Sequence, residues 1–189
     1  MTDKQLPGKS TADSESKPRA LKEEQSVTQT GSSVSTLAHG VSTHPIVTHH
    51  DERGSVGELY DPRWNWHADP LISSTFVTIH PGKVKGWALH DVMEDRFALL
   101  SGKAEFVFFD DRDGSPTKGS ISKIIISEND RQVIRVPTGL WHAVHNIGPN
   151  DVVIINFPTQ PYQYEDPDKY RLPLNTDLIP YKFEERKGF

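Results

Sequence analysis

The stretch PTGLWHAVHN, residues 137–146, places a Pro-Gly turn directly before a short run of aromatic, β-branched and small residues. Pro and Gly are typical of turns, and such a run is typical of a strand. Because side chains alternate along a strand, we expect His142 and His145 to point to opposite faces. The stretch therefore predicts a turn followed by a strand that presents one histidine on each face of a sheet.

Short runs of the same kind continue in both directions, separated by Gly, Pro, Asn and Asp. No stretch of 12 residues keeps the 3.6-residue period of a helix. Short strands that recur about every ten residues predict an antiparallel all-β sandwich or barrel. The expected strands cover residues 45–48, 55–60, 75–80, 85–90, 96–100, 104–109, 121–127, 132–136, 141–146 and 152–157.

The two ends of the chain differ in composition from the middle. Residues 1–40 are rich in Ser, Thr, Lys, Glu and Gln, and the first aromatic residue is Tyr60. Such a segment buries too little apolar surface to offset the conformational entropy lost on folding. We therefore expect a disordered tail over residues 1–40 and one folded domain over residues 41–189. The Pro- and Tyr-rich segment 161–189 predicts irregular chain with a helical turn near residues 166–170.

Charge and composition exclude several classes of function. The 189-residue chain has a formal net charge of −5, all of it outside residues 1–40, and a mildly acidic domain argues against nucleic acid or an anionic membrane as a partner. Without cysteine, neither a disulfide framework nor a thiolate zinc site is available. No run approaches 18 apolar residues, so no membrane-spanning or secretory segment is predicted, and the cytoplasm is the expected location.

Two segments resemble the signatures of cupin barrels. The P-x-G-x-x-H-x-x-x-N pattern of residues 137–146 matches the second signature. Residues 82–102 match the first, except that Ala88 stands where the pattern has its first metal histidine. The ligands that remain are His90, Glu94 and His142. Because two histidines and a carboxylate suit a transition metal, a metal-dependent cupin enzyme is one alternative.

A broader resemblance runs through five blocks in order, which are residues 51–58, 84–90, 101–102, 111–117 and 136–142. In this order they are similar to the dTDP-4-dehydrorhamnose 3,5-epimerase family. The most specific pieces are the Asp-x-Arg-Gly start and the Gly-Ser-Pro-Thr loop. The resemblance implies a cupin jelly roll, which is a double-stranded antiparallel β-barrel. It also implies no metal or other cofactor, and a homodimer whose N-terminal strands are exchanged between subunits.

The chemistry of that family assigns three catalytic roles. Epimerisation beside a ketone needs a base for the α-proton, a group that steadies the enolate oxygen and an acid that returns a proton. By resemblance His90 is the base, and His142 lies in the same pocket, where it supports the base or polarises the ketone. Lys85 stands nearest to the family's substrate-holding arginine and would stabilise the enolate.

The resemblance also assigns residues that bind the substrate. Arg53 and Glu58 match the pair that holds the nucleotide diphosphate, and Arg96 lies near another basic residue of the pocket. Asn156 stands where the family has its acid tyrosine, and an amide can only form hydrogen bonds there. Tyr162 belongs with these residues and is a candidate to supply the acid from a shifted position.

Together these assignments predict an epimerase or isomerase that acts on a nucleotide-linked 4-keto-6-deoxy sugar by abstracting a proton next to the ketone. The family's C-terminal aspartate, which orients the base, is not recognisable in the sequence. The loss of the acid tyrosine leaves a second alternative open, a non-catalytic cupin that binds a sugar nucleotide. The sequence does not specify the sugar, the nucleotide or the carbon that is epimerised.

Overall fold

The computed structural model describes residues 25–31 and 33–183, and the chain forms two compact units, Met1–Ser35 and Thr36–Phe189. In the first unit, the N–H of Gly31 donates to the Thr28 carbonyl at 3.0 Å, and Val27 forms a bridge with Ser33. The rest of the predicted tail in this unit, residues 1–24 and 32, lies outside the described residues.

The second unit begins before the boundary that composition predicts. Ala38 is 1% exposed and lies in the main hydrophobic core, with Leu37 packed against the same cluster. The backbone N–H of Ala38 donates to Ser122 Oγ at 2.8 Å. Residues 36–40 therefore belong to the barrel rather than to the tail.

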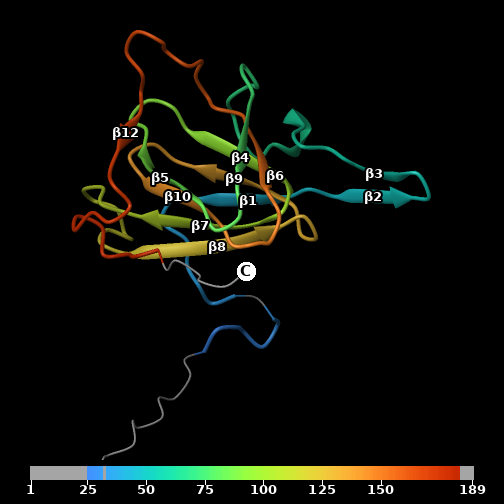
Figure 1. Cartoon of the computed structure of the whole chain (residues 1–189), viewed down its shortest axis with the longest axis horizontal. Helices are drawn as coiled ribbons and strands as arrows, with labels where there is room; N and C mark the ends of the chain where they lie inside the picture. The colour runs from blue at the N-terminus through green and yellow to red at the C-terminus, as the bar shows by residue number, and fades with distance from the viewer. Residues whose placement is uncertain (1–24, 32, 184–189) are drawn as a thin grey trace, which may run out of the picture. The chain divides into compact units, whose positions relative to one another are not determined.

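The regular secondary structure of the second unit is almost entirely strand, as the sequence predicts (Figure 1). Among the described residues the one helical element is the 3₁₀ turn η1 (Pro62–Trp64), and no long apolar helix suited to spanning a membrane occurs. The strands are β1 (Ser42–Pro45), β2 (Thr48–Asp51), β3 (Gly54–Gly57), β4 (Thr75–Ile79), β5 (Val84–Leu89), β6 (Asp95–Ser101), β7 (Lys103–Phe109), β8 (Ile121–Ser127), β9 (Gln132–Val136), β10 (Trp141–Asn146), β11 (Val152–Asn156) and β12 (Tyr170–Arg171).

Ten of these strands form two five-stranded antiparallel sheets, in the orders β1-β9-β6-β11-β4 and β12-β5-β10-β7-β8. The inward side chains of both sheets meet in one core, in which Leu99 of β6 and Ile154 of β11 join Phe106 and Phe108 of β7. Each of these four side chains is at most 1% exposed. The sheets are therefore held together mainly by burial of apolar surface.

The segment from residue 48 to residue 57 departs from the predicted strands at 45–48 and 55–60. Here β2 and β3 pair only with each other, with Thr48 opposite Gly57 and Asp51 opposite Gly54. Figure 1 shows this hairpin extending away from the two sheets. Its turn is fixed locally, because the N–H of Arg53 donates to Asp51 Oδ1 at 2.9 Å.

The C-terminal segment forms a strand instead of the predicted helical turn at 166–170. β12 extends the second sheet by pairing Tyr170 with Leu89 of β5. Pro167 disfavours a helix here, because its ring fixes φ and it lacks an N–H. Further along, Ile179 packs with the fully buried Trp87 in a second cluster, on a face of the sheet separate from the main core.

Candidate active site

One pocket, of about 190 Å³, is lined by residues of both sheets and of the C-terminal segment. Val77, Ile79, Phe97, Val144 and Ile154 supply apolar walls. The polar residues of the lining include the predicted Lys85, His90, His142, Asn156 and Tyr162, together with Asp95, Lys169 and Arg171. The structure therefore brings five of the eight predicted site residues to one pocket.

Close packing of β5 on β10 places the two histidines side by side. A Cβ on Gly86 of β5 would lie only 2.3 Å from the Cβ of Ala143 on β10, so only glycine permits this approach. The turn before β10 is tied to the end of β5, because the N–H of Gly139 donates to the His90 carbonyl at 2.7 Å. The imidazole centroids of His90 and His142 consequently lie 5.7 Å apart.

Asp95, at the start of β6, joins the two histidines. Its Oδ2 lies 3.3 Å from Nε2 of His90 and 3.3 Å from Nε2 of His142. Its Oδ1 accepts a hydrogen bond from Nδ2 of Asn156 at 2.7 Å. All three members of the cluster are buried, at 8%, 3% and 6% exposed for His90, Asp95 and His142. The position predicted for the acid therefore holds an amide that orients this carboxylate.

Backbone carbonyls fix which nitrogen of each imidazole carries the proton. Nδ1 of His90 faces the Asp168 carbonyl, and Nδ1 of His142 lies 3.1 Å from the Leu140 carbonyl. A carbonyl oxygen can only accept, so both Nδ1 atoms carry hydrogen. Both Nε2 atoms are consequently left for exchange of protons with Asp95 or with a molecule in the pocket.

The charge of Asp95 determines the proton affinity of the cluster. Burial lowers the pKa of His90, but the hydrogen bond and negative charge of Asp95, with the Asp168 carbonyl, outweigh it and raise this pKa above its ordinary 6.5. Burial raises the pKa of Asp95, but His142 and His90 together hold it far below its usual range. The carboxylate therefore stays ionised and favours the protonated form of His90.

Asp168, in the C-terminal segment, contacts His90 through its backbone carbonyl and not through its carboxylate. Besides the contact of its carbonyl with His90, its carboxylate accepts from the N–H groups of Asp91, Val92 and Met93 at 2.8, 2.9 and 2.8 Å. It thereby holds the turn between β5 and β6, which carries His90 and Asp95. Asp168 lies 78 residues after His90, so no short motif contains both residues, and the sequence alone does not reveal their contact.

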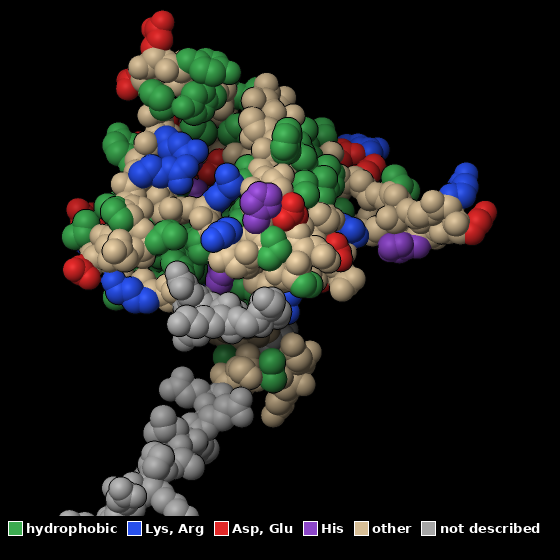
Figure 2. All heavy atoms as spheres, in the orientation of Figure 1, with side chains coloured by type: hydrophobic (Ala, Val, Ile, Leu, Met, Phe, Trp, Pro, Cys, Tyr) green, Lys and Arg blue, Asp and Glu red, His purple; other side chains and the backbone are tan. Residues whose placement is uncertain are grey.

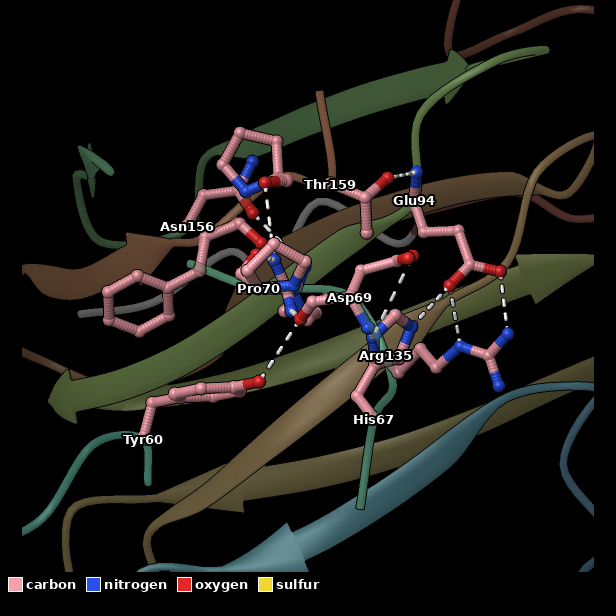
Figure 3. A network of polar contacts seen from close by, with 11 residues as sticks. Tyr60, His67, Asp69, Pro70, Glu94, Arg135, Asn156 and Thr159 are labelled. Atoms are coloured by element: carbon pink, nitrogen blue, oxygen red, sulfur yellow. Dashed lines mark hydrogen bonds and ion pairs between the residues drawn. The ribbon is translucent and has the colours of Figure 1, made fainter. Parts of the chain in front are cut away.

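Glu94, the carboxylate of the alternative metal set, lies outside the cluster. Its oxygens accept from Nε and Nη2 of Arg135 at 2.7 and 2.6 Å and from Nε2 of His67 at 2.7 Å (Figure 3). Among the described residues, the ligand atoms of His90, Asp95 and His142 instead lie within 4.8 Å of one another. Two imidazoles and a carboxylate are donors that suit a divalent transition metal, with Asp95 in place of Glu94.

Arg96, predicted to bind the substrate, is a structural anchor beneath the surface. It is fully buried, and its guanidinium donates to the carbonyls of Phe157 at 2.7 Å, Asp69 at 2.7 Å and Pro70 at 3.0 Å. Figure 3 shows Asp69 also accepting from the Tyr60 hydroxyl through its backbone carbonyl. Because its guanidinium N–H groups donate to backbone carbonyls, Arg96 holds the segment before β4 in place. It does not line the pocket.

Arg53 and Glu58 also lie away from the pocket that holds the histidines. Arg53 is on the β2–β3 turn, where its guanidinium pairs with Asp51 at 2.5 Å and its side chain is 83% exposed. Glu58 follows β3, with Oε1 3.9 Å from Nη2 of Arg63. Neither residue contributes to the pocket that holds the histidines within its own chain.

The fold and this pocket define the class of protein. Two antiparallel sheets around a pocket with paired histidines make the second unit a cupin jelly roll. A solved dTDP sugar isomerase of Desulfovibrio desulfuricans superposes with a TM-score of 0.72 at 21% identity, over 77% of this chain and 92% of that one. A dTDP-6-deoxy-D-glucose-3,5-epimerase of Legionella pneumophila, in complex with dTDP-4-keto-L-rhamnose, gives 0.69 at 18% identity, over 82% and 84%.

The sequence comparison is more specific. The model of the polysaccharide biosynthesis C-terminal domain family matches residues 49–170, and the chain belongs to this family. The probable low-salt glycan biosynthesis epimerase Agl13 of Haloferax volcanii is 37% identical over 139 residues, which cover 72% of this chain and 88% of that relative. The spore coat polysaccharide biosynthesis protein SpsL of Bacillus subtilis is 26% identical over 147 residues, covering 78% and 97%.

Proposed function

We propose that this protein is an epimerase or isomerase that acts on a nucleotide-linked 4-keto-6-deoxy sugar by removing a proton beside the ketone. The observation that carries the proposal is the buried His90–Asp95–His142 cluster on the wall of an otherwise largely apolar pocket. Apolar walls suit the methyl group of a deoxy sugar, and the cluster supplies groups that exchange protons near neutral pH. The names of the relative at 37% identity and of the structural neighbours agree with this chemistry.

His90 is the base in this proposal. Its neutral Nε2 takes the proton from the carbon beside the ketone, and the C–H electron pair forms the enolate. His142 contacts the same oxygen of Asp95 as His90 does, so it lies on the same side of the pocket and polarises the ketone. The phenol of Tyr162, in the same pocket, returns a proton to the carbon from the other face, and exchange with solvent restores both groups. Asn156, at the position expected for the acid, orients Asp95 instead.

Lys85 stabilises the enolate oxygen in this proposal. It lies on β5 in the lining of the same pocket, and Val144 of β10, two residues beyond His142, pairs with it. A cation placed where negative charge develops lowers the barrier of the deprotonation step. Tyr162 lines the same pocket and contacts the substrate there.

We further propose a homodimer in which the β2–β3 hairpin of one protomer supplies Arg53 and Glu58 to its partner's pocket. Two observations support this arrangement. The hairpin pairs only with itself, and Val56 on it is 70% exposed. Neither predicted nucleotide-binding residue lines the pocket of its own chain. Location in the cytoplasm stays a prediction from the sequence.

The first experiment follows hydrogen exchange by proton NMR, with dTDP-4-keto-6-deoxyglucose in D₂O. Wild-type protein should introduce deuterium at C3 or C5, and His90→Ala should lower the rate at least about 100-fold, since general base catalysis supplies factors of this size. The matched control is His80→Ala, because His80 is an exposed histidine paired with Asp151 and outside the pocket. Exchange at the wild-type rate in His90→Ala would remove His90 from the role of base.

Two further measurements separate the alternative functions. A metal-dependent enzyme on His90, Asp95 and His142 would contain about one metal ion per chain in elemental analysis of untagged protein, and a chelator would stop its turnover. A non-catalytic binding protein would be stabilised against heat by the nucleotide sugar without any exchange at the sugar carbons. The proposed epimerase shows exchange that survives the chelator.

A further inference from the structure

Glu94 and Asp95 are neighbours in sequence, but their side chains lie on opposite faces of the first sheet. Asp95 lines the pocket with the histidines, whereas Glu94 binds Arg135 of β9. Arg135 points away from the core, because Ile134 and Val136 on either side of it belong to the main core and side chains alternate along a strand. Any effect of Glu94 on the reaction must therefore pass through the backbone that it shares with Asp95.

Side-chain hydrogen bonds fix the carboxylate of Glu94 on this outer face (Figure 3). The guanidinium of Arg135 binds both of its oxygens, at 2.7 and 2.6 Å. Nδ1 of His67 accepts the N–H of Asp69 at 3.1 Å, so Nε2 carries the hydrogen that is donated to Glu94 at 2.7 Å. A planar guanidinium meets a carboxylate in a preferred orientation, and the imidazole adds a third contact. The side chain of Glu94 is thus held from two different segments of the chain.

The backbone of Glu94 is fixed as well. Its N–H donates to Oγ1 of Thr159 at 2.9 Å, and its carbonyl accepts from the N–H of Thr159 at 3.1 Å. Thr159 is buried and follows β11, the strand that pairs with β6. Together with the side-chain contacts, these two hydrogen bonds define where β6 begins, and Asp95 is the first residue of that strand.

The negative charge of Glu94 keeps these contacts together. The acidic side chains at the tip of the β2–β3 hairpin project into solvent (Figure 2), whereas the side chain of Glu94 is only 16% exposed. Burial raises the pKa of Glu94, but Arg135 and His67 outweigh it and lower this pKa. The carboxylate therefore stays ionised and accepts all three N–H groups. A glutamine of the same shape would accept through one oxygen only and turn its NH₂ group toward another donor.

We infer that Glu94 is a positioning residue, which through the start of β6 holds the Asp95 carboxylate against His90 and His142. The inference rests on the proposed function and deepens it. Oδ2 of Asp95 lies 3.3 Å from Nε2 of each histidine, so a displacement of the strand would lengthen at least one of these contacts. A misplacement of about 1 Å can cost a factor of about 100 in rate. Arg135 acts at one further remove, by holding Glu94.

Kinetics of the exchange reaction test this role. Glu94→Gln should lower kcat at least about tenfold and leave KM nearly unchanged, because Glu94 does not line the pocket. Arg135→Lys keeps the charge but gives up the two-point contact, so kcat should fall by a smaller factor. The matched control is Glu128→Gln, on the exposed turn between β8 and β9, where Glu128 accepts the N–H of Gly102 at 3.0 Å. This control should keep the wild-type kcat.

A double variant separates positioning from a general loss of structure. Asp95→Asn alone removes the carboxylate that Glu94 positions. Adding Glu94→Gln to it should therefore lower kcat by less than about twofold further, whereas independent effects would multiply. A further tenfold loss in the double variant, on the order of the effect of Glu94→Gln alone, would overturn the inference.

Nitrogen NMR of the histidine rings gives a readout that needs no substrate. In Glu94→Gln the Nε2 signals of His90 and His142 should move, while Glu128→Gln should leave them unchanged. Moved signals in a protein that shows no proton exchange would uphold the positioning role and overturn the proposed reaction. Exchange at the wild-type rate with unmoved signals in Glu94→Gln would overturn the positioning role and leave the reaction standing. If Glu94→Gln does not fold, the same two readouts on Arg135→Lys decide between these outcomes.

Discussion

At the scale of single residues, Asp95 decides what the pocket can do. One carboxylate oxygen faces two imidazole nitrogens at equal distances of 3.3 Å, while the other is held by Asn156. Both histidines are held in one tautomer by backbone carbonyls, so a proton shared with Asp95 has only two nitrogens on which to reside. The residue that looked least suited to acid–base chemistry, Asn156, serves by fixing this carboxylate.

The first consequence is that kcat/KM should increase with pH. His90 acts as a base only when Nε2 is unprotonated, so kcat/KM should rise with pH to a midpoint above the ordinary 6.5, because Asp95 raises the pKa of His90. Asp95→Asn keeps the shape and removes the charge, which leaves burial to lower that pKa. The midpoint of the variant should therefore move to lower pH.

The measurement is the pH–rate profile of both proteins, together with NMR titration of the His90 ring protons. We also expect kcat of Asp95→Asn to fall at least about tenfold, because the carboxylate that orients the base His90 and raises its pKa is lost. A variant whose midpoint stays at the wild-type value would contradict the role given to Asp95. The thermal midpoint of the variant checks that it remains folded.

The sequence predicted the residues of the site only in part, for physical reasons. His90 and His142 each lie in a sequence motif next to a turn, and the pairing of β5 with β10 brings the two motifs together. Asp95 follows Glu94 in a polar run, and alternation alone does not say which carboxylate faces inward. The sequence places Arg96 among the substrate-binding residues, whereas its guanidinium is buried and donates to backbone carbonyls. Every residue has a backbone carbonyl, so no sequence pattern marks such a contact.

At the scale of elements, strands with regular alternation were predicted well and isolated ones were not. β4 to β11 lie within two residues of their predicted bounds, because each is flanked by turn residues and buries one or both faces. The β2–β3 hairpin and β12 bury little of their surface, so their sequences lack the alternation that marks a strand.

The hairpin provides a prediction at this scale. Val56→Glu places a charge on an exposed apolar side chain of β3, so it should leave the barrel folded and shift a dimer to monomers. Catalysis should fall with the dimer, because Arg53 would no longer reach the partner's pocket. The measurement is light scattering coupled to size exclusion, with turnover measured on the same fractions.

The control for the hairpin is Ile125→Glu on β8, a residue that is 50% exposed and belongs to the second sheet. This change should alter neither the mass in solution nor the turnover. A wild-type protein that is already a monomer, or a Val56→Glu variant that stays dimeric and active, would contradict the hairpin's role at the pocket.

At the scale of the whole molecule, composition separates tail from barrel but misplaces the boundary. Residues 36–40 contain no aromatic residue, yet Ala38 fills a core position and His39 donates its N–H to Thr117 Oγ1 at 2.8 Å. A short polar-looking segment can be ordered by a few contacts to a large domain. The structure therefore assigns five more residues to the barrel than composition does.

Truncation tests this boundary. Removing residues 1–35 should leave the melting temperature nearly unchanged, since composition predicts no packing there. Removing residues 1–40 should lower it by at least about 3 °C, because burial of Ala38 and Leu37 is lost together with the hydrogen bonds of Ala38 and His39. Differential scanning calorimetry of the two proteins measures the difference, and equal melting temperatures would place residues 36–40 in the tail.

The buried Arg96 has a consequence for how relatives of this chain can diverge. Its guanidinium binds the main chain at Asp69, Pro70 and Phe157, and every amino acid offers a carbonyl there. Substitutions at those three positions therefore preserve the anchor, whereas replacement of Arg96 would leave several acceptors stranded at once. These three positions are thus free to vary in sequence while one side chain holds their backbone in place.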